Sequence, residues 1–385
     1  MSVLQVEKPS WMTEDVDIFA DAVGKFCEKE LAPHVEAWEK AEIVDRDVWF
    51  KAGEAGLLCP SMPEQYGGGG GTFAHEAALI DQFGKEGITG FGASLHNAIV
   101  APYIYHYGTE EQRQRWLPKM ATGELVGAIA MTEPGTGSDL QNIKATAKLD
   151  GNEYVINGSK TFITNGQTAN LIIVVCKTDP TAGAKGTSLI LVETDEAEGF
   201  RRGRNLDKVG LKSQDTSELF FDNVRVPTSN LLGEEAGKGF IQLMQQLASE
   251  RLQIGLQGVA MMEAAIEHTV AYVKERKAFG QAVMDFQNTQ FKLAEAKTKT
   301  TVARVFVDYC TGLLLEGKLD AATASMAKYW VSDVQCEVVD ECLQLHGGYG
   351  YMNEYPIARM YRDARVQKIY GGTNEIMKVL ISRTL

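Results

Sequence analysis

The chain has 385 residues, of which 44% are hydrophobic, and a formal net charge of −13 at pH 7. A chain of this length can bury substantial cores in two or three domains. Nucleic acid and anionic membranes are disfavoured as partners, because either would need a basic face and the sequence has no dense run of lysine or arginine. No run of about eighteen apolar residues occurs, so we expect no membrane span.

The six cysteines form no CxxC pair and no regular framework. This spacing predicts reduced thiols in a cytosol-like compartment. Residues 1–10 contain no basic segment followed by an apolar run, so the sequence predicts no secretory leader. We therefore expect a soluble protein of a bacterial cytoplasm or, if the chain has been processed, of the mitochondrial matrix.

Residues 1–123 have the periodicity of amphipathic helices and are predicted to form an N-terminal helical domain. The predicted helices cover residues 13–32, 47–56, 73–85, 91–107 and 110–122. The last of them begins with a capping box, in which Thr109 and Gln112 satisfy each other's backbone N–H groups.

Near residue 124 the pattern changes to the alternation of strands, so residues 124–232 are predicted to form a central antiparallel β domain. The predicted strands cover residues 143–147, 154–156, 171–177, 187–192 and 218–226. Two Asn-Gly pairs, Asn157-Gly158 and Asn165-Gly166, predict tight turns. No strand is followed by GxGxxG, so a dinucleotide would not be held in the Rossmann manner.

Residues 233–385 return to helical periodicity, now in long segments. The predicted helices cover residues 240–277, 284–316, 321–346 and 374–385. Short connections between such helices favour an antiparallel four-helix bundle, since each helix must bury its apolar stripe against a neighbour. The fold class is therefore α+β, in the order helical, β, helical.

Several kinds of chemistry are disfavoured by missing motifs. The six histidines show neither HExxH nor Cys/His spacing, so we expect no metal site, and no GxSxG elbow suggests a serine hydrolase. His346 precedes Gly347-Gly348 and either contacts a ligand or caps its helix.

A short loop has the composition of a ligand-binding segment. Residues 130–139, Ala-Met-Thr-Glu-Pro-Gly-Thr-Gly-Ser-Asp, end an apolar run and supply glycines, hydroxyls and a carboxylate. Gly135 and Gly137 permit close approach of a ligand to the backbone, and Ser138 offers a hydroxyl. The alternative is a well-capped surface loop.

One carboxylate falls on an apolar helix stripe. Glu250 lies three residues after Leu247 and four before Ile254, within the predicted helix 240–277. Burial would raise its pKa toward neutrality and suit it to remove a proton. The alternative is a structural ion pair with Arg251 or another base.

Two glycine-containing segments near the C-terminus precede helices. Residues 344–356 link two helices, and residues 370–375 open the last one. A helix N-terminus preceded by small residues can seat a carbonyl or phosphate oxygen. Each segment on its own could equally be an ordinary connection that ends one helix and begins the next.

Taken together, four segments resemble the acyl-CoA dehydrogenase family over nearly the whole chain. Residues 130–139 resemble its first signature and 344–363 its second, and 160–166 and 275–280 are similar to further family segments. The resemblance implies FAD bound between the β domain and the bundle, and oxidation of an acyl-CoA thioester to the trans-2-enoyl-CoA. It also implies electron transfer to an electron-transferring flavoprotein and a homo-oligomer, usually a tetramer.

The resemblance also implies a role for particular residues. The flavin and its substituents would contact Ile129, Met131, Thr132, Gly137, Ser138, Phe162, Thr164, Thr373 and Glu375. The adenine and pyrophosphate half of a neighbouring subunit's FAD would contact Arg276, Phe279, Gln287, Gln344, Gly347 and Gly348. The substrate would contact Ser138, Leu247, Arg251, Tyr370, Gly371 and Gly372, with the Gly372 N–H on the thioester carbonyl.

The sequence departs from many relatives at the catalytic base. Their glutamate precedes Gly-Thr before the last helix, where this chain has Gly371, which cannot take a proton. Long-chain and isovaleryl-type members carry the base before an arginine on the long helix, and Glu250-Arg251 matches that place. We therefore expect Glu250 to be the base, with Glu375 as the other candidate, and the substrate to be long or branched.

Two other functions remain open at this stage. An acyl-CoA oxidase would return the electrons to oxygen, although such proteins are usually much longer. A non-catalytic acyl-CoA or flavin-binding scaffold would keep the fold without turnover, and the presence of Glu250 argues against it.

Overall fold

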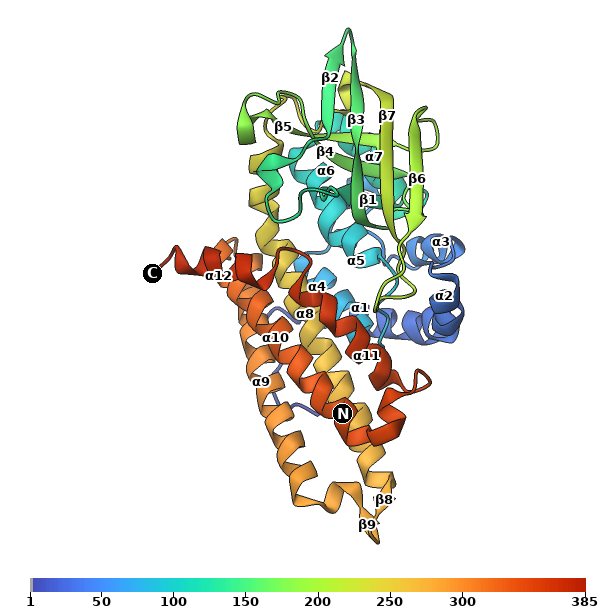
Figure 1. Ribbon diagram of the computed structural model, residues 1–385, viewed down its shortest axis with the longest axis vertical. Coiled ribbons are helices and arrows are strands. Elements are labelled where there is room, and N and C mark those ends of the chain that lie inside the picture. The colour runs from blue at the N-terminus through green and yellow to red at the C-terminus, as the bar shows by residue number, and fades with distance from the viewer. Residues whose placement is uncertain (1–2) are drawn as a thin grey trace.

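The computed structural model describes residues 3–385 as three successive parts (Figure 1). The first part is helical, as predicted. Its helices are α1 (Glu14–Phe26), α2 (Val35–Ala41), α3 (Asp47–Glu54), α4 (Phe73–Lys85), α5 (Ala93–Leu95), α6 (Ala101–Tyr107) and α7 (Glu110–Ala121). The capping box of α7 is confirmed, because Thr109 Oγ1 accepts from the Gln112 N–H and Gln112 Oε1 accepts from the Thr109 N–H.

The second part is a curved sheet that covers one end of the molecule (Figure 1). Its strands are β1 (Gly127–Ala130), β2 (Thr146–Asp150), β3 (Glu153–Thr164), β4 (Leu171–Lys177), β5 (Thr187–Glu193), β6 (Phe200–Asn205) and β7 (Thr216–Pro227). The order is β1-β4-β2-β3-β7-β6, with β5 paired to β4. Most strand pairs are antiparallel, as predicted. However, β4 runs parallel to both β1 and β2, whereas a sheet built from hairpins would be antiparallel throughout.

One of the two predicted turns is wrong. Asn157-Gly158 lies inside the continuous strand β3, where the register against β7 shifts between Ile156 and Gly158. The extra residue is on β7, where Asn223 has a left-handed φ of 52°, so the Asn-Gly pair stays within β3 opposite a β-bulge. Asn165-Gly166 does end β3 in a turn, and Asn165 has the left-handed φ of 60°.

The third part is the helical bundle, which extends away from the sheet (Figure 1). Its helices are α8 (Gly239–Glu275), α9 (Gln287–Leu315), α10 (Ala321–His346), α11 (Pro356–Ala364) and α12 (Asn374–Ser382). A small hairpin, β8 (Lys277–Ala278) and β9 (Gln281–Ala282), joins α8 to α9. The buried cluster of the bundle draws on α4, α8, α9, α10 and α11 but not on α12, so the last predicted helix is not a member of the bundle core.

The 37-residue helix α8 connects the sheet to the helical bundle. It begins at Gly239, whose backbone lies against Ser188 of β5, and continues through the bundle. A residue in its first half therefore lies near the junction between the sheet and the bundle (Figure 1).

Within residues 3–385, no helix is long and apolar enough to cross a membrane, and no group of acidic, cysteine and histidine side chains is arranged to hold a metal ion. All six cysteines are free thiols, and all except Cys336 are buried.

Candidate active site

The loop that follows β1 is anchored by a buried ion pair. Lys160 Nζ on β3 lies 2.9 Å from Glu133 Oε1 and donates to the carbonyl oxygen of Met131, also at 2.9 Å. The Glu133 carboxylate further accepts from the backbone N–H groups of Lys144 and Ala145. These contacts, with Lys160 as the largest of the favourable ones, lower the pKa of Glu133 despite its burial, so the carboxylate stays charged and holds the loop.

Glu133 is buried under the loop, and the loop residues that were predicted to bind ligands are at least partly exposed to solvent. Gly137 and Ser138 are exposed, while Met131 and Thr132 are half-buried beside β3, where the Thr161 N–H donates to the Thr132 carbonyl. The loop therefore presents the Ser138 hydroxyl outward, whereas Thr136 is buried and its hydroxyl donates to the Asn142 carbonyl.

Phe162 is the most unusual residue of β3. It lies where the register between β3 and β7 shifts, has a φ of 59°, and is 67% exposed. A non-glycine residue in the left-handed region is uncommon and is concentrated at functional sites. The bulge turns the ring out of the sheet, next to the half-buried Thr164 and on the strand that pairs with Thr132.

Glu250 is buried at the junction between α8 and α6, with 7% of its surface exposed. Tyr103 on α6 donates its hydroxyl to Glu250 Oε1 at 2.8 Å. Burial is the largest influence and raises the pKa of Glu250 to about 7, against the opposing effects of the Tyr103 hydrogen bond and the charge of Arg251. Burial thus brings the pKa of this carboxyl close to neutral pH.

Arg251 does not form the ion pair that was the structural alternative for Glu250. Within residues 3–385, no Arg251 nitrogen lies within 4.0 Å of the Glu250 carboxylate. Arg251 Nη1 instead donates to Ser325 Oγ on α10 at 3.5 Å, and its Nε is buried without a partner. Neighbouring positions on α8 thus place the acid toward α6 and the base toward α10.

The face of α8 that carries Glu250 lies against residues 370–372. Positions 250, 254 and 257 share one face, because side chains three and four apart are neighbours on a helix. Tyr370 donates its hydroxyl to Gln257 Oε1 at 3.3 Å, and a Cβ at Gly371 would lie 2.3 Å from Ile254 Cδ1. Position 371, where a base was also considered, therefore lies against α8 at Ile254, one turn after Glu250.

The segment from Gly371 to Asn374 has an unusual backbone. Gly371 and Gly372 have φ values of 64° and 93°. Thr373 caps α12 by accepting from the Ile376 N–H at 3.4 Å. Behind the turn, Lys328 on α10 donates to the Gly372 carbonyl at 2.7 Å.

Glu375, the other candidate base, is exposed in the first turn of α12. Its pKa is lowered, chiefly by backbone hydrogen bonding and by the Thr373 hydroxyl. A carboxylate that is already ionised, exposed and placed at a helix N-terminus fits a capping role better than proton abstraction. Leu247, one turn before Glu250, is half-buried.

A second group of predicted residues gathers at the far end of the bundle. Arg276, Gln344, Gly347 and Gly348 line one pocket of about 560 Å³. His346 also lines it, donating Nδ1–H to the Cys342 carbonyl at 2.8 Å and stacking on Tyr272, so it serves both as a cap and as a pocket wall.

Phe279 and Gln287 lie nearby without lining that pocket. Phe279 is 97% exposed on the β8–β9 hairpin, with a φ of 51°, and its ring lies edge-on to Phe286. Gln287 begins α9 and is exposed. This pocket and hairpin are at the opposite end of the bundle from the sheet (Figure 1).

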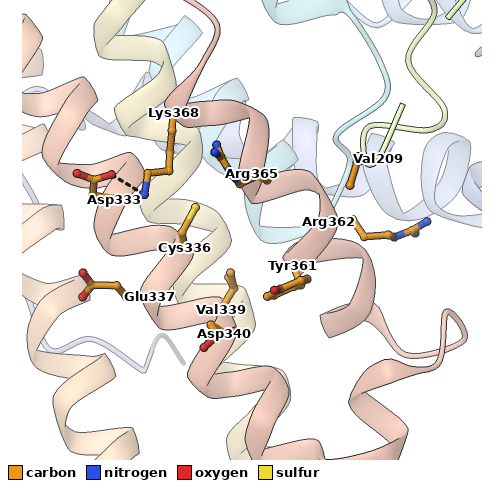
Figure 2. Close-up of a pocket in the computed structure, with 10 residues that line it drawn as sticks. All are labelled: Val209, Asp333, Cys336, Glu337, Val339, Asp340, Tyr361, Arg362, Arg365 and Lys368. Carbon is orange, nitrogen blue, oxygen red and sulfur yellow. Dashed lines mark ion pairs between the residues drawn. The ribbon is translucent and has the colours of Figure 1, made fainter. Parts of the chain in front are cut away.

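Another pocket, of about 520 Å³, contains none of the predicted residues (Figure 2). Figure 2 shows it between α10 and α11, with Asp333, Cys336 and Glu337 on one side and Tyr361 and Arg365 on the other. Its acidic and basic side chains include the ion pair between Lys368 Nζ and Asp333 Oδ1, at 2.7 Å.

Sequence reasoning missed three polar residues of this region: Tyr103, Lys160 and Lys328. Tyr103 is 147 positions from Glu250, and nothing local marks it as a partner. Lys160 and Lys328 look like surface residues in the sequence, yet both are fully buried. Lys328 shares its buried helix face with Ala324 and Val331 but also with Ser325 and Ser332, so the signal in the sequence was weak.

Three family models match successive parts of the chain. The N-terminal domain of acyl-CoA dehydrogenase matches residues 13–124, the middle domain 128–224 and the C-terminal domain 237–385. The chain therefore belongs to the acyl-CoA dehydrogenase family and is an FAD-dependent oxidoreductase acting on acyl-CoA.

Individual relatives agree over nearly the full length. The chain is 53% identical over 371 residues to the mitochondrial long-chain specific acyl-CoA dehydrogenase of Sus scrofa, covering 96% of this chain and 86% of that protein. It superposes on a crystal structure of acyl-CoA dehydrogenase from Geobacillus kaustophilus with a TM-score of 0.96 and 50% identity, covering 98% and 99% of the two chains.

A third relative is an acyl-CoA dehydrogenase from Bacillus anthracis solved in complex with FAD. The TM-score is 0.91 and the identity 34%, over 100% of this chain and 69% of that chain. The pocket around Arg276 fits such a cofactor, because a guanidinium suits a pyrophosphate and Gly347 and Gly348 leave open space where side chains would otherwise stand.

Proposed function

We propose that this protein oxidises a long-chain acyl-CoA to the trans-2-enoyl-CoA and that Glu250 is the base that removes the α-proton. The observation that carries the proposal is the setting of Glu250. Its carboxylate is buried, has a pKa of about 7, is free of an ion pair, and lies on the α8 face against Gly371. A general base works best when its pKa is near the operating pH.

The chain supplies the other groups that the reaction needs. The α-proton of a thioester is weakly acidic, so negative charge developing on the carbonyl oxygen must be stabilised. The Gly372 N–H is the proposed donor, on a turn that has no side chain to obstruct the thioester. Tyr103 donates to Oε1 of the Glu250 carboxylate. Within the described residues, this is the one hydrogen bond of the Glu250 side chain, so Oε2 is left for the substrate.

When bound, FAD accepts two electrons and so makes the oxidation of the β-carbon possible. The flavin is proposed to lie against the segment around Thr132, with Phe162, Thr164 and Ser138 beside it. The pocket around Arg276 and the exposed Phe279 are proposed to hold the adenine and pyrophosphate half of a neighbouring subunit's FAD. The distance of this pocket from Glu250 along α8 supports such sharing, and with it a homo-oligomer, of which a tetramer is the family's usual form.

The long acyl chain is proposed from the relative in Sus scrofa and from the position of the base before Arg251. We propose an electron-transferring flavoprotein as the acceptor, in keeping with the family. The compartment is proposed to be a bacterial cytoplasm or a mitochondrial matrix.

Anaerobic titration of the purified holoenzyme with butyryl-, isovaleryl- and palmitoyl-CoA tests the proposal. We expect palmitoyl-CoA to bleach the flavin absorbance fastest and to yield the trans-2-enoyl-CoA by mass spectrometry. Faster bleaching by isovaleryl-CoA would contradict the long-chain assignment. A flavin that no thioester bleaches would instead favour a non-catalytic scaffold, and peroxide formation in air at the rate of turnover would favour an oxidase.

A further inference from the structure

Lys328 is a buried lysine without a carboxylate partner. It lies within α10, is 0% exposed, and has no carboxylate oxygen within 4.0 Å of Nζ in the part of the chain that the structure describes. Its ammonium donates to the Gly372 carbonyl at 2.7 Å and to Asn374 Oδ1 at 2.9 Å. Both acceptors belong to the turn that leads into α12.

This position is unfavourable for a cation. Burial, together with the charge of Arg251, lowers the pKa of Lys328 to about 8. The ammonium also lies at the N-terminus of α12, where the helix dipole favours anions. Burying a charge is costly, and an apolar residue of similar length would fill the same space without that cost.

The turn that Lys328 holds would otherwise be loosely determined. Two consecutive glycines lose more conformational freedom on ordering than any other pair of residues, and neither Gly371 nor Gly372 has a side chain to fix it. Asn374 is held in turn by α10, because its Nδ2 donates to Ser332 Oγ at 3.0 Å and to Asp333 Oδ1 at 3.1 Å.

The same network reaches the surface pocket of Figure 2. Asp333 Oδ1, which accepts from Asn374, also pairs with Lys368 in that pocket. The turn before α12 is thus tied to α10 by a continuous set of hydrogen bonds, of which Lys328 makes the contact with the peptide group of Gly372.

We propose that Lys328 is a positioning residue of the active site, which fixes the Gly371–Thr373 turn so that the Gly372 N–H faces the thioester carbonyl oxygen. Its charge also favours the negative charge that develops on this oxygen when the α-proton leaves. The inference rests on the proposed function, because it assumes that the thioester carbonyl binds at Gly372.

The test separates the hydrogen bond from the charge. Lys328→Met removes both, whereas Lys328→Gln, with a side chain one bond shorter, keeps an N–H donor on the side of the Gly372 carbonyl and removes the charge. Lys177→Met is the matched control, because Lys177 on β4 is also buried and donates to a backbone carbonyl, that of Gly183, and to Thr187 Oγ1. FAD content and thermal midpoint are measured for each variant.

The readout is exchange of the α-protons of a 3-thiaacyl-CoA with D2O, followed by mass spectrometry. Sulfur at the β-position prevents oxidation, so exchange reports proton removal without flavin reduction. Loss of one donor to a developing oxyanion costs about a hundredfold or more. We expect Lys328→Met to slow exchange by about that factor, Lys328→Gln by about tenfold, and Lys177→Met to leave it unchanged.

Exchange by Lys328→Met at the wild-type rate would overturn the inference, and so would equal losses in Lys328→Met and Lys328→Gln. If Lys328→Met does not fold, a wild-type exchange rate in Lys328→Gln overturns it equally. Failure of the wild-type enzyme to exchange the α-protons at all would count against the proposed function itself, whatever the Lys328 variants do.

Discussion

Replacement of Glu250 by glutamine tests the proposed base with a minimal change in shape. Glutamine has nearly the same size as glutamate and keeps an oxygen that can accept from Tyr103, so the α8–α6 contact survives. Only the ability to take a proton is lost. Because general bases contribute about 10²–10⁴-fold, we expect anaerobic flavin reduction by palmitoyl-CoA to slow by at least about a hundredfold.

The same substitution, although it lowers activity, should raise the stability of the folded protein at high pH. The pKa of Glu250 rises from 4.5 to about 7 on folding, and each pKa unit is worth about 1.4 kcal/mol, so ionising this carboxylate costs the folded state about 3 kcal/mol. Between pH 4.5 and 7 the folded state binds more protons than the unfolded state, and stability falls as pH rises. Glu250→Gln should therefore melt higher than wild type at pH 8 and no higher near pH 4.5.

Glu76→Gln is the matched control. Glu76 on α4 is also buried, accepts a hydrogen bond from a hydroxyl, that of Ser61, and has a pKa raised by burial to about 7. Because the hydrogen bonds that Glu76 forms within the described residues are with Ser61 and not with the 370–372 turn, its substitution should leave flavin reduction unchanged while reproducing the stability effect. Near-normal reduction in Glu250→Gln, or equal slowing in Glu76→Gln, would refute the assignment of the base.

Three further outcomes follow from the contacts of the site. Tyr103→Phe removes a hydrogen bond that favours the charged form of Glu250 and is worth about 1.5–3 kcal/mol. The pH profile of flavin reduction should therefore move about 1–2 pH units higher. An unmoved profile would show that Tyr103 does not act on the base. Gly371→Glu in the Glu250→Gln background should restore part of the reduction, because the Ile254 Cδ1 that a Cβ at position 371 would meet at 2.3 Å is the end of a flexible side chain; no recovery would show that positions 250 and 371 do not face one substrate carbon. Arg276→Ala should weaken FAD binding about tenfold or more, as measured by flavin fluorescence, and unchanged affinity would place the pyrophosphate elsewhere.

The parts of the site that depend on residues close together in the sequence could be predicted, whereas contacts between residues far apart in the sequence could not. Glu250 was found because its position on the apolar stripe of a helix is a local pattern of three- and four-residue spacings. Tyr103 could not be found in this way, because its contact with Glu250 depends on how α6 packs against α8. Lys328 is a similar case, since its acceptor on Gly372 is 44 positions away.

The fold shows the same division. Long helices were predicted within a few residues because their periodicity is strong, and the strand 171–177 because it is a continuous apolar run, whereas β6 has too little alternation to be recognised. Asn157-Gly158 was predicted to be a turn because Asn-Gly is a strong local turn signal, yet the pair lies within β3 opposite a bulge of β7. The pairing of β3 with β7, which decides between the two, is not visible in either strand alone.

The most direct measurement is a crystal structure of the holoenzyme with 3-thiapalmitoyl-CoA, which binds as the substrate does but is not oxidised. The account predicts that the α-carbon lies about 3–3.5 Å from a Glu250 carboxylate oxygen and that the thioester carbonyl accepts from the Gly372 N–H. An α-carbon that faces Glu375, or any group other than Glu250, would contradict it.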